Sequence, residues 1–142
     1  INKQTRTTYH WERKITLMLN EHETEQAVMV MYGMLPSVRF TAHGKDKKGW
    51  MQIAQQDPNS QYAGCVQVQL GRGEGTLTTN IYPTQLSKIK TVVLRAYVQM
   101  MGFDSMDAAL RHLHMSASSY AIYAEMNPPR ETPRRQAYGN RG

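Results

Sequence analysis

The sequence predicts an α+β fold: an antiparallel sheet of about five strands with helices packed on one face. Short segments of alternating polarity recur between tight-turn sequences, which is typical of half-buried strands joined as hairpins. Residues 75–101 change at Pro83 from this alternation to helical spacing. A chain of 142 residues with 40% apolar residues is sufficient for one core. We therefore expect a single domain at 13–126, between a basic arm at 1–12 and a flexible Pro/Arg-rich tail at 127–142.

The first two elements are a strand and a helix. Residues 13–19 alternate, with Ile15, Leu17 and Leu19 on one side, and so predict a half-buried strand. Asn20 stands three residues before Glu23, in the pattern of a capping box, and Glu21, Glu23 and Glu25 suit the positive end of a helix dipole. Apolar residues then recur at helical spacing until Pro36. The alternative is a strand through Val28, Val30 and Tyr32.

Four further strands are expected at 37–43, 50–55, 66–70 and 76–82. In the first of these, Val38, Phe40 and Ala42 should point inward and Arg39, Thr41 and His43 outward. Residues 44–49 form a lysine-rich turn, and the glycine-rich residues 71–75 form a second hairpin tip. Gln67 and Gln69 should lie on an open face of the sheet, because an antiparallel sheet can leave one face to solvent or a ligand.

The strongest helix is predicted at 84–101, ending at Gly102. Its core stripe contains Leu86, Ile89, Val93 and Tyr97 with Met100 or Met101. Val92, Leu94 and Val98 make the apolar arc wider than one sheet face requires, which favours a dimer contact. A shorter helix should follow from a cap at Asp104 or Ser105 to His114, with another at 116–125.

The net charge of +6 is concentrated at the two ends of the chain. Residues 1–14 and 127–142 each carry +3, whereas residues 15–126 hold nine basic and nine acidic side chains. Basic arms attract phosphate through long-range electrostatics and counterion release. The alternative is that these arms only increase solubility.

Several other classes of function find little support. Cys65 is the single cysteine, so no disulfide can form within the chain and the cytoplasm or another reducing compartment is expected. His112 and His114 lack the spacing of a helical zinc pair, and residues 71–75 lack the Gly-Lys-Ser/Thr of a phosphate loop. No apolar run approaches the roughly 20 residues of a membrane span. We expect no membrane contact, cofactor, metal or catalytic residue; an enzyme would need His43, Asp46 and another acid in one pocket.

Nucleic-acid binding fits the remaining features best. Bases stack on aromatic side chains, and nearby cations follow the phosphates. Candidate stacking residues are Trp50, Tyr82 and Trp11, and candidate phosphate contacts are Arg39, Lys45, Lys47, Lys48, Arg72, Arg130, Arg134 and Arg135. The alternative for each aromatic residue is a place in the core, and a lysine-rich turn can be simply solvated.

Two resemblances point in the same direction. A meander that ends at Pro83, followed by Gln85 and a helix containing Ile89-Lys90, resembles the transcriptional-coactivator and whirly group of single-strand binders. The strand at 76–82, a helix, the residues Gly102-Phe103-Asp104-Ser105 and a second helix resemble a ribbon-helix-helix repressor. The latter resemblance implies a ribbon paired across a dimer, with Thr76, Thr78 and Asn80, or Thr79 and its neighbours, in the major groove. Each resemblance covers less than a third of the chain.

We therefore expect a non-enzymatic, homo-oligomeric protein that binds nucleic acid, with single-stranded DNA or RNA favoured over duplex. The first alternative is a dimeric, ribbon-helix-helix-like regulator of duplex DNA. The second is a structural or assembly subunit of viral or plasmid origin, which would use the wide apolar arc and the terminal arms as partner contacts.

Overall fold

A computed structural model describes residues 17–128 and shows an α+β fold with one antiparallel sheet of four strands and three helices. The elements in chain order are α1 (Glu21–Met31), β1 (Ser37–His43), β2 (Gly49–Gln55), β3 (Val66–Arg72), β4 (Gly75–Ile81), α2 (Pro83–Met101) and α3 (Met106–Met126). The expected strand at 13–19 is not formed over residues 17–19, and residues 13–16 lie outside the described part. The arm at 1–12 and most of the tail at 127–142 lie outside it too.

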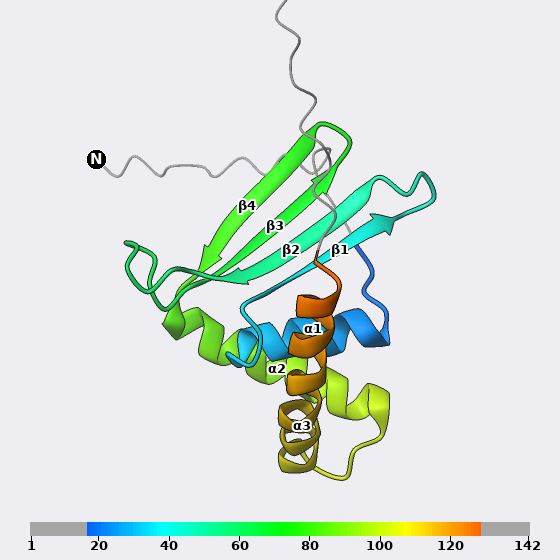
Figure 1. Cartoon of the computed structure of the whole chain (residues 1–142), viewed down its shortest axis with the longest axis vertical. Coiled ribbons are helices and arrows are strands. Elements are labelled where there is room, and N and C mark those ends of the chain that lie inside the picture. The colour runs from blue at the N-terminus through cyan, green and yellow to red at the C-terminus, as the bar shows by residue number, and fades with distance from the viewer. Residues whose placement is uncertain (1–16, 129–142) are drawn as a thin grey trace, which may run out of the picture.

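The sheet is a meander in the order β1-β2-β3-β4 (Figure 1). Gly49 of β2 is opposite Arg72 of β3, and Arg72 is opposite Gly75 of β4. Gln55, Val66 and Ile81 are aligned in the same way at the other end. The β1–β2 and β3–β4 hairpin tips consequently lie at one end of the sheet, and the start of α2 lies at the other.

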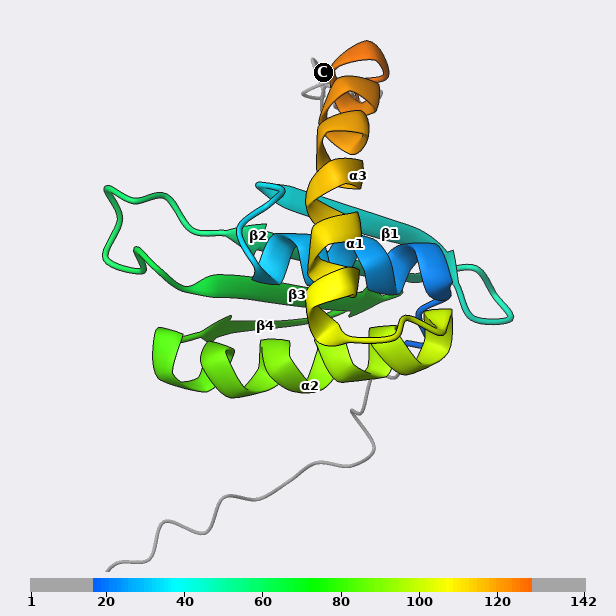
Figure 2. The ribbon, with the colours of Figure 1, turned by 90° about the horizontal axis from the view of Figure 1, so that it is seen from below.

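All three helices lie on the same side of the sheet. Figure 2 shows α1 and α2 side by side in this layer, with α3 crossing α1. The core between the helices and the sheet contains Val28, Met29 and Val30 of α1, Phe40, Ile53 and Val66 of the strands, and Leu94, Tyr97 and Leu113 of α2 and α3. No described helix covers the opposite face of the sheet.

The helix ends follow the expected capping chemistry. The Asn20 side chain accepts a hydrogen bond from the Glu23 backbone N–H at 2.9 Å, and the Glu23 carboxylate accepts one from the Asn20 N–H at 3.1 Å. Gly102 ends α2 with a φ of 74°, in the left-handed region that favours glycine. The capping box explains why residues 28–31 are helical, with Tyr32 as the C-cap, rather than forming the alternative strand.

One prediction about the C-terminal helices was wrong. The expected pair at 104–114 and 116–125 is one helix, α3, because no glycine or proline interrupts it and Leu113, Ala117 and Tyr120 continue its packed side.

The predicted core stripe of α2 is confirmed in part. Tyr97 is buried, and Leu86 and Val93 are partly buried against the core. Ile89, Met100 and Met101 are more than one-third exposed, and Leu94 is buried. The cause is that α2 packs chiefly against α1, which rotates part of the predicted stripe away from the core.

Candidate nucleic-acid interface

The face of the sheet that no described helix covers, called the open face below, is polar along all four strands. Cross-strand partners point to the same face, and Phe40 and Ile53 point to the core, so their sequence neighbours point away from it. The resulting rows on the open face are Arg39, Gln52, Gln69 and Thr78; Trp50, Gly71 and Thr76; and Ala54, Gln67 and Asn80. Gln67 and Gln69 thus lie on the open face, as the alternation predicts.

Trp50 lies on this open face rather than in the core. Its side chain is half-buried because the indole covers Gly71 of the neighbouring strand, and a Cβ at Gly71 would overlap the ring. The Arg39 guanidinium lies 4.5 Å from the centre of the Trp50 ring, within the range of a cation–π interaction. Arg39 also donates a hydrogen bond to the Gln52 side-chain oxygen at 3.1 Å. These three side chains form a cluster that joins β1 and β2.

The lysine-rich tip of the β1–β2 hairpin is exposed, as expected. Lys45, Lys47 and Lys48 are all solvent-exposed, and the Asp46 carboxylate accepts a hydrogen bond from the Lys48 backbone N–H at 3.2 Å. Arg72, at the start of the other tip, extends to Gly44. The two tips therefore meet, and together they carry four cations against the carboxylates of Asp46 and Glu74.

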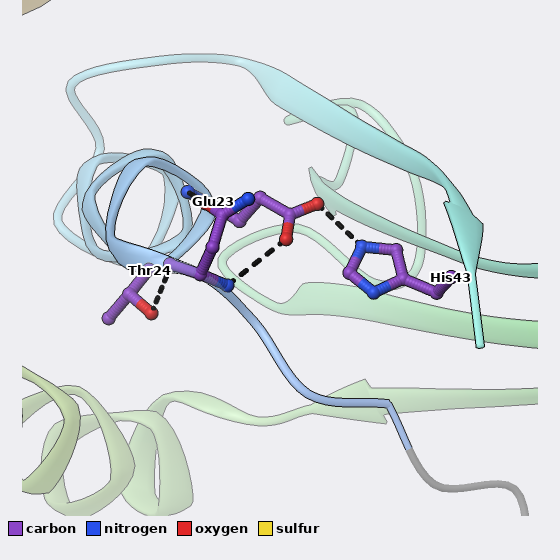
Figure 3. A network of polar contacts seen from close by, with 4 residues as sticks. Glu23, Thr24 and His43 are labelled. Atoms are coloured by element: carbon purple, nitrogen blue, oxygen red, sulfur yellow. Dashed lines mark hydrogen bonds and ion pairs between the residues drawn. The ribbon is translucent and has the colours of Figure 1, made fainter. Parts of the chain in front are cut away.

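His43 does not point outward with Arg39, so that prediction was wrong. The β1–β2 register shifts between Phe40 and His43, where Ala42 has a φ of 60°. This bulge interrupts the alternation and turns His43 towards α1. Its Nε2 lies 2.6 Å from a carboxylate oxygen of Glu23 (Figure 3). The same glutamate caps α1, so the end of β1 is tied to the first turn of the helix.

Tyr82 lies far from Trp50. It is the N-cap residue of α2, half of its side chain is exposed, and it follows Ile81 at the end of the sheet opposite the tips. The separation between the two rings spans most of a seven-residue strand, or roughly 20 Å. Trp11, Arg130, Arg134 and Arg135 lie outside the described residues.

Glu25 has a role that the sequence pattern did not reveal. It was expected only as a first-turn acid, yet it is buried and accepts hydrogen bonds from the hydroxyls of Tyr97 at 2.9 Å and Tyr120 at 3.2 Å. Burial, followed by the effect of Glu25, raises the pKa of both tyrosines. This cluster joins α1, α2 and α3 behind the sheet, so we assign it to the stability of the fold.

No family model, curated protein or solved structure matches this chain. Within residues 17–128, no group of three metal-binding side chains comes together, and none of the helices there is long and apolar enough to cross a membrane.

Proposed function

We propose that this protein binds single-stranded nucleic acid, without catalysis, through the open face of its sheet. The observation that carries the proposal is the Arg39–Trp50 pair on the face that no described helix covers, next to two hairpin tips that together carry four cations at one end of the sheet. An aromatic ring and a cation on an accessible sheet face are the two groups that a base and its phosphate require.

Trp50 and Arg39 supply a stacking surface for one base. The indole rests against Gly71 and is covered by the guanidinium. A base can displace Arg39 and stack on the ring, or stack on the guanidinium plane itself, since both surfaces are used in recognition of unpaired bases. The displaced guanidinium would then be available to a phosphate.

The polar rows beside Trp50 suit base edges without demanding one sequence. Gln52, Gln67 and Gln69 each carry one amide donor group and one acceptor, which can pair with the edge of any base. Their position on the central strands β2 and β3 places them along the path from the tips towards Tyr82. We propose Tyr82 as a second stacking residue at the far end of that path.

The hairpin tips supply the phosphate contacts. Lys45, Lys47 and Lys48 are exposed, so their charges can follow a flexible backbone. Arg130, Arg134 and Arg135 of the tail would add further attraction that decreases with salt. A homo-oligomer would repeat this surface and lengthen the strand that it holds.

Fluorescence anisotropy with labelled oligonucleotides tests the proposal. Single-stranded DNA, single-stranded RNA and a duplex of the same sequence are titrated with the full chain across a series of salt concentrations. We expect the single strands to bind more tightly than the duplex, with an affinity that falls as salt rises. A protein that binds neither single strand at low salt would refute the proposal.

An assembly subunit is a second candidate, and exposed apolar residues of the helices favour it. The exposed fractions of Val92, Met115, Tyr123 and Met126 are 66%, 76%, 67% and 77%, well above those of core residues. A viral or plasmid-borne subunit would bury these side chains against neighbours. Oligomers that persist at high salt, together with no binding of oligonucleotides, would support this candidate over the first.

Duplex binding and catalysis have weaker support. A duplex-binding ribbon would use Thr76, Thr78 and Asn80 of β4, which lie on the open face but already pair with β3 of the same chain. An enzyme would use His43 and Asp46, which do line one hollow with Glu23 bonded to His43. Among the described lining residues, however, no hydroxyl or thiol is available as a nucleophile.

The free thiol of Cys65 bears on the compartment. It is buried in the structure, and no second cysteine exists in the chain with which it could form an internal disulfide. We propose a reducing compartment such as the cytoplasm, where free thiols persist.

A further inference from the structure

A hollow at the tip end of the sheet has the features of an anion site. It is open to solvent, has a volume of about 810 Å³, and its lining includes Leu17, His43, Lys45, Asp46 and Arg72. A Cβ on Gly49 would meet the side chains of Leu17 at 2.8 Å and His43 at 3.0 Å, and Gly49 shares the face of Met51 and Ile53. The hollow therefore lies on the helix side of the sheet, and its pair Gly49 and Arg72 is next to the open-face pair Trp50 and Gly71.

Arg72 reaches this hollow because residue 44 is a glycine. Arg72 has the same strand parity as Val68 and Leu70, so it leaves β3 towards the helix side. A Cβ at Gly44 would overlap its guanidinium, and the φ of 85° at Gly44 is one that other residues rarely adopt. The absence of a side chain at Gly44 thus allows an arginine of one hairpin to lie beside the tip of the other.

His43 of β1 and Leu17, which precedes α1, line the hollow on the helix side of the sheet. The His43 ring is held by Glu23 (Figure 3), and the Asn20 backbone N–H donates a hydrogen bond to the same carboxylate. The Leu17 side chain contributes apolar surface next to the ring. The hollow lies at the tip end of the sheet, beyond the last row of the open face at Trp50 and Gly71, so it suits the end of a strand rather than a continuing backbone.

The charges in the hollow favour an anion. Lys45 and Arg72 form no ion pair with another described residue. Asp46 accepts the Lys48 backbone N–H, and Glu23 accepts the Asn20 N–H while it bonds His43. The described lining thus carries the two positive charges of Lys45 and Arg72 against the one negative charge of Asp46. Arginine offers paired N–H donors that match phosphate oxygens, and a terminal phosphate carries more charge than an internal linkage.

We propose that this hollow binds the terminal phosphate of the strand that the open face holds. Arg72 and Lys45 contact the phosphate oxygens, and the fixed His43 ring forms the inner wall. This inference rests on the proposed function. It adds that the protein prefers a single strand with a phosphate at one particular end.

The test compares three single-stranded oligonucleotides of one sequence, with a 5′-phosphate, a 3′-phosphate or hydroxyls at both ends. We expect the phosphate at one end to tighten binding roughly tenfold, as charge-assisted hydrogen bonds to a guanidinium would. Equal affinity of all three oligonucleotides would overturn the inference while leaving the proposed function intact. If no oligonucleotide binds, the proposed function fails, and titration of a deoxynucleoside 5′-monophosphate against the NMR signals of His43 still tests the hollow.

Variants separate a built site from diffuse attraction. Arg72→Gln should abolish the preference for the phosphorylated end, and Gly44→Ala should do the same by displacing the guanidinium. Gly73→Ala is the matched control, because Gly73 also has a positive φ, 58°, yet a Cβ there would meet nothing within 4 Å. A preference that survives in Arg72→Gln, or tightening by both end phosphates alike, would overturn the proposal.

Discussion

The guanidinium of Arg39 lies 4.5 Å from the centre of the Trp50 ring, on the side of the sheet opposite the three helices. A tryptophan in a strand usually packs into the core, where its large apolar surface is buried. Here the core is complete without it, because Met51 and Ile53, its neighbours in β2, supply the apolar side chains on the helix face. A partly exposed ring that lies outside the core is free to bind a ligand.

Replacement of Trp50 separates a binding role from a structural one. Trp50→Ala should weaken single-strand binding by about 1–3 kcal/mol, the usual contribution of one stacked base. The domain should remain folded, because the indole lies outside the core. Anisotropy gives the affinity and circular dichroism gives the unfolding transition. Trp50→Phe keeps an aromatic face and should retain most of the affinity; loss of folding in Trp50→Ala would show that the ring is structural.

The hairpin lysines should determine the salt dependence of binding. Replacement of Lys45, Lys47 and Lys48 by glutamine removes three phosphate contacts, so the slope of log affinity against log salt should decrease by about 2 for a single strand. The matched control replaces Lys88, Arg95 and Arg111, which are exposed on α2 and α3, and so makes the same change in net charge. If both triple variants change the slope equally, the attraction is diffuse and the tip is not part of the interface.

Local pattern predicted most of the elements, because each depends on neighbours in the chain. The strand at 37–43, the helix that begins after Asn20 and the end of α2 at Gly102 all appear where alternation and capping place them. Lys45, Lys47 and Lys48 are exposed at a tip, as a charged turn should be.

The site depends on relationships that the pattern does not contain. At the bulge, Ala42 has a positive φ, which an alanine in the sequence does not indicate. This one irregularity turns His43 to the helix side. In the sequence, Glu25 cannot be distinguished from Glu21 and Glu23. Its buried position depends on hydrogen bonds from the hydroxyls of Tyr97 and Tyr120, which are 72 and 95 residues further along the chain. The meeting of Arg72 with Gly44 likewise depends on tertiary structure.

The outer side of α2 should hold the contact between protein copies. Val92 is 66% exposed, whereas Leu94, two residues later, is fully buried. Val92→Glu should therefore shift the protein towards monomers without changing its unfolding, since the new charge is costly only at an interface. Leu94→Ala should instead destabilise the fold by about 2–5 kcal/mol, because it leaves a cavity in the core. Light scattering with urea unfolding distinguishes these effects; a wild-type protein that is monomeric at every concentration would contradict the expectation.

The stability of the fold should decrease at alkaline pH through the Glu25 cluster. Burial and the adjacent Glu25 carboxylate raise the pKa of Tyr97 and Tyr120 above the value of about 10 in the unfolded chain. A raised pKa means that the folded state holds these two protons more tightly than the unfolded chain does. The protonated tyrosines therefore make their full contribution to the free energy of unfolding below about pH 10, and this contribution is lost as the pH rises beyond it. Urea unfolding measured from about pH 8 to about pH 11, a range that brackets the pKa of about 10 of a free tyrosine, gives the decline in the free energy of unfolding.

Tyr97→Phe should make the decline shallower and lower the free energy of unfolding by about 1–3 kcal/mol at neutral pH, because Glu25 loses a buried hydrogen-bond donor. Tyr82→Phe, at an exposed tyrosine, should follow the wild-type curve, and a Tyr97→Phe curve with the wild-type decline would show that other groups cause it.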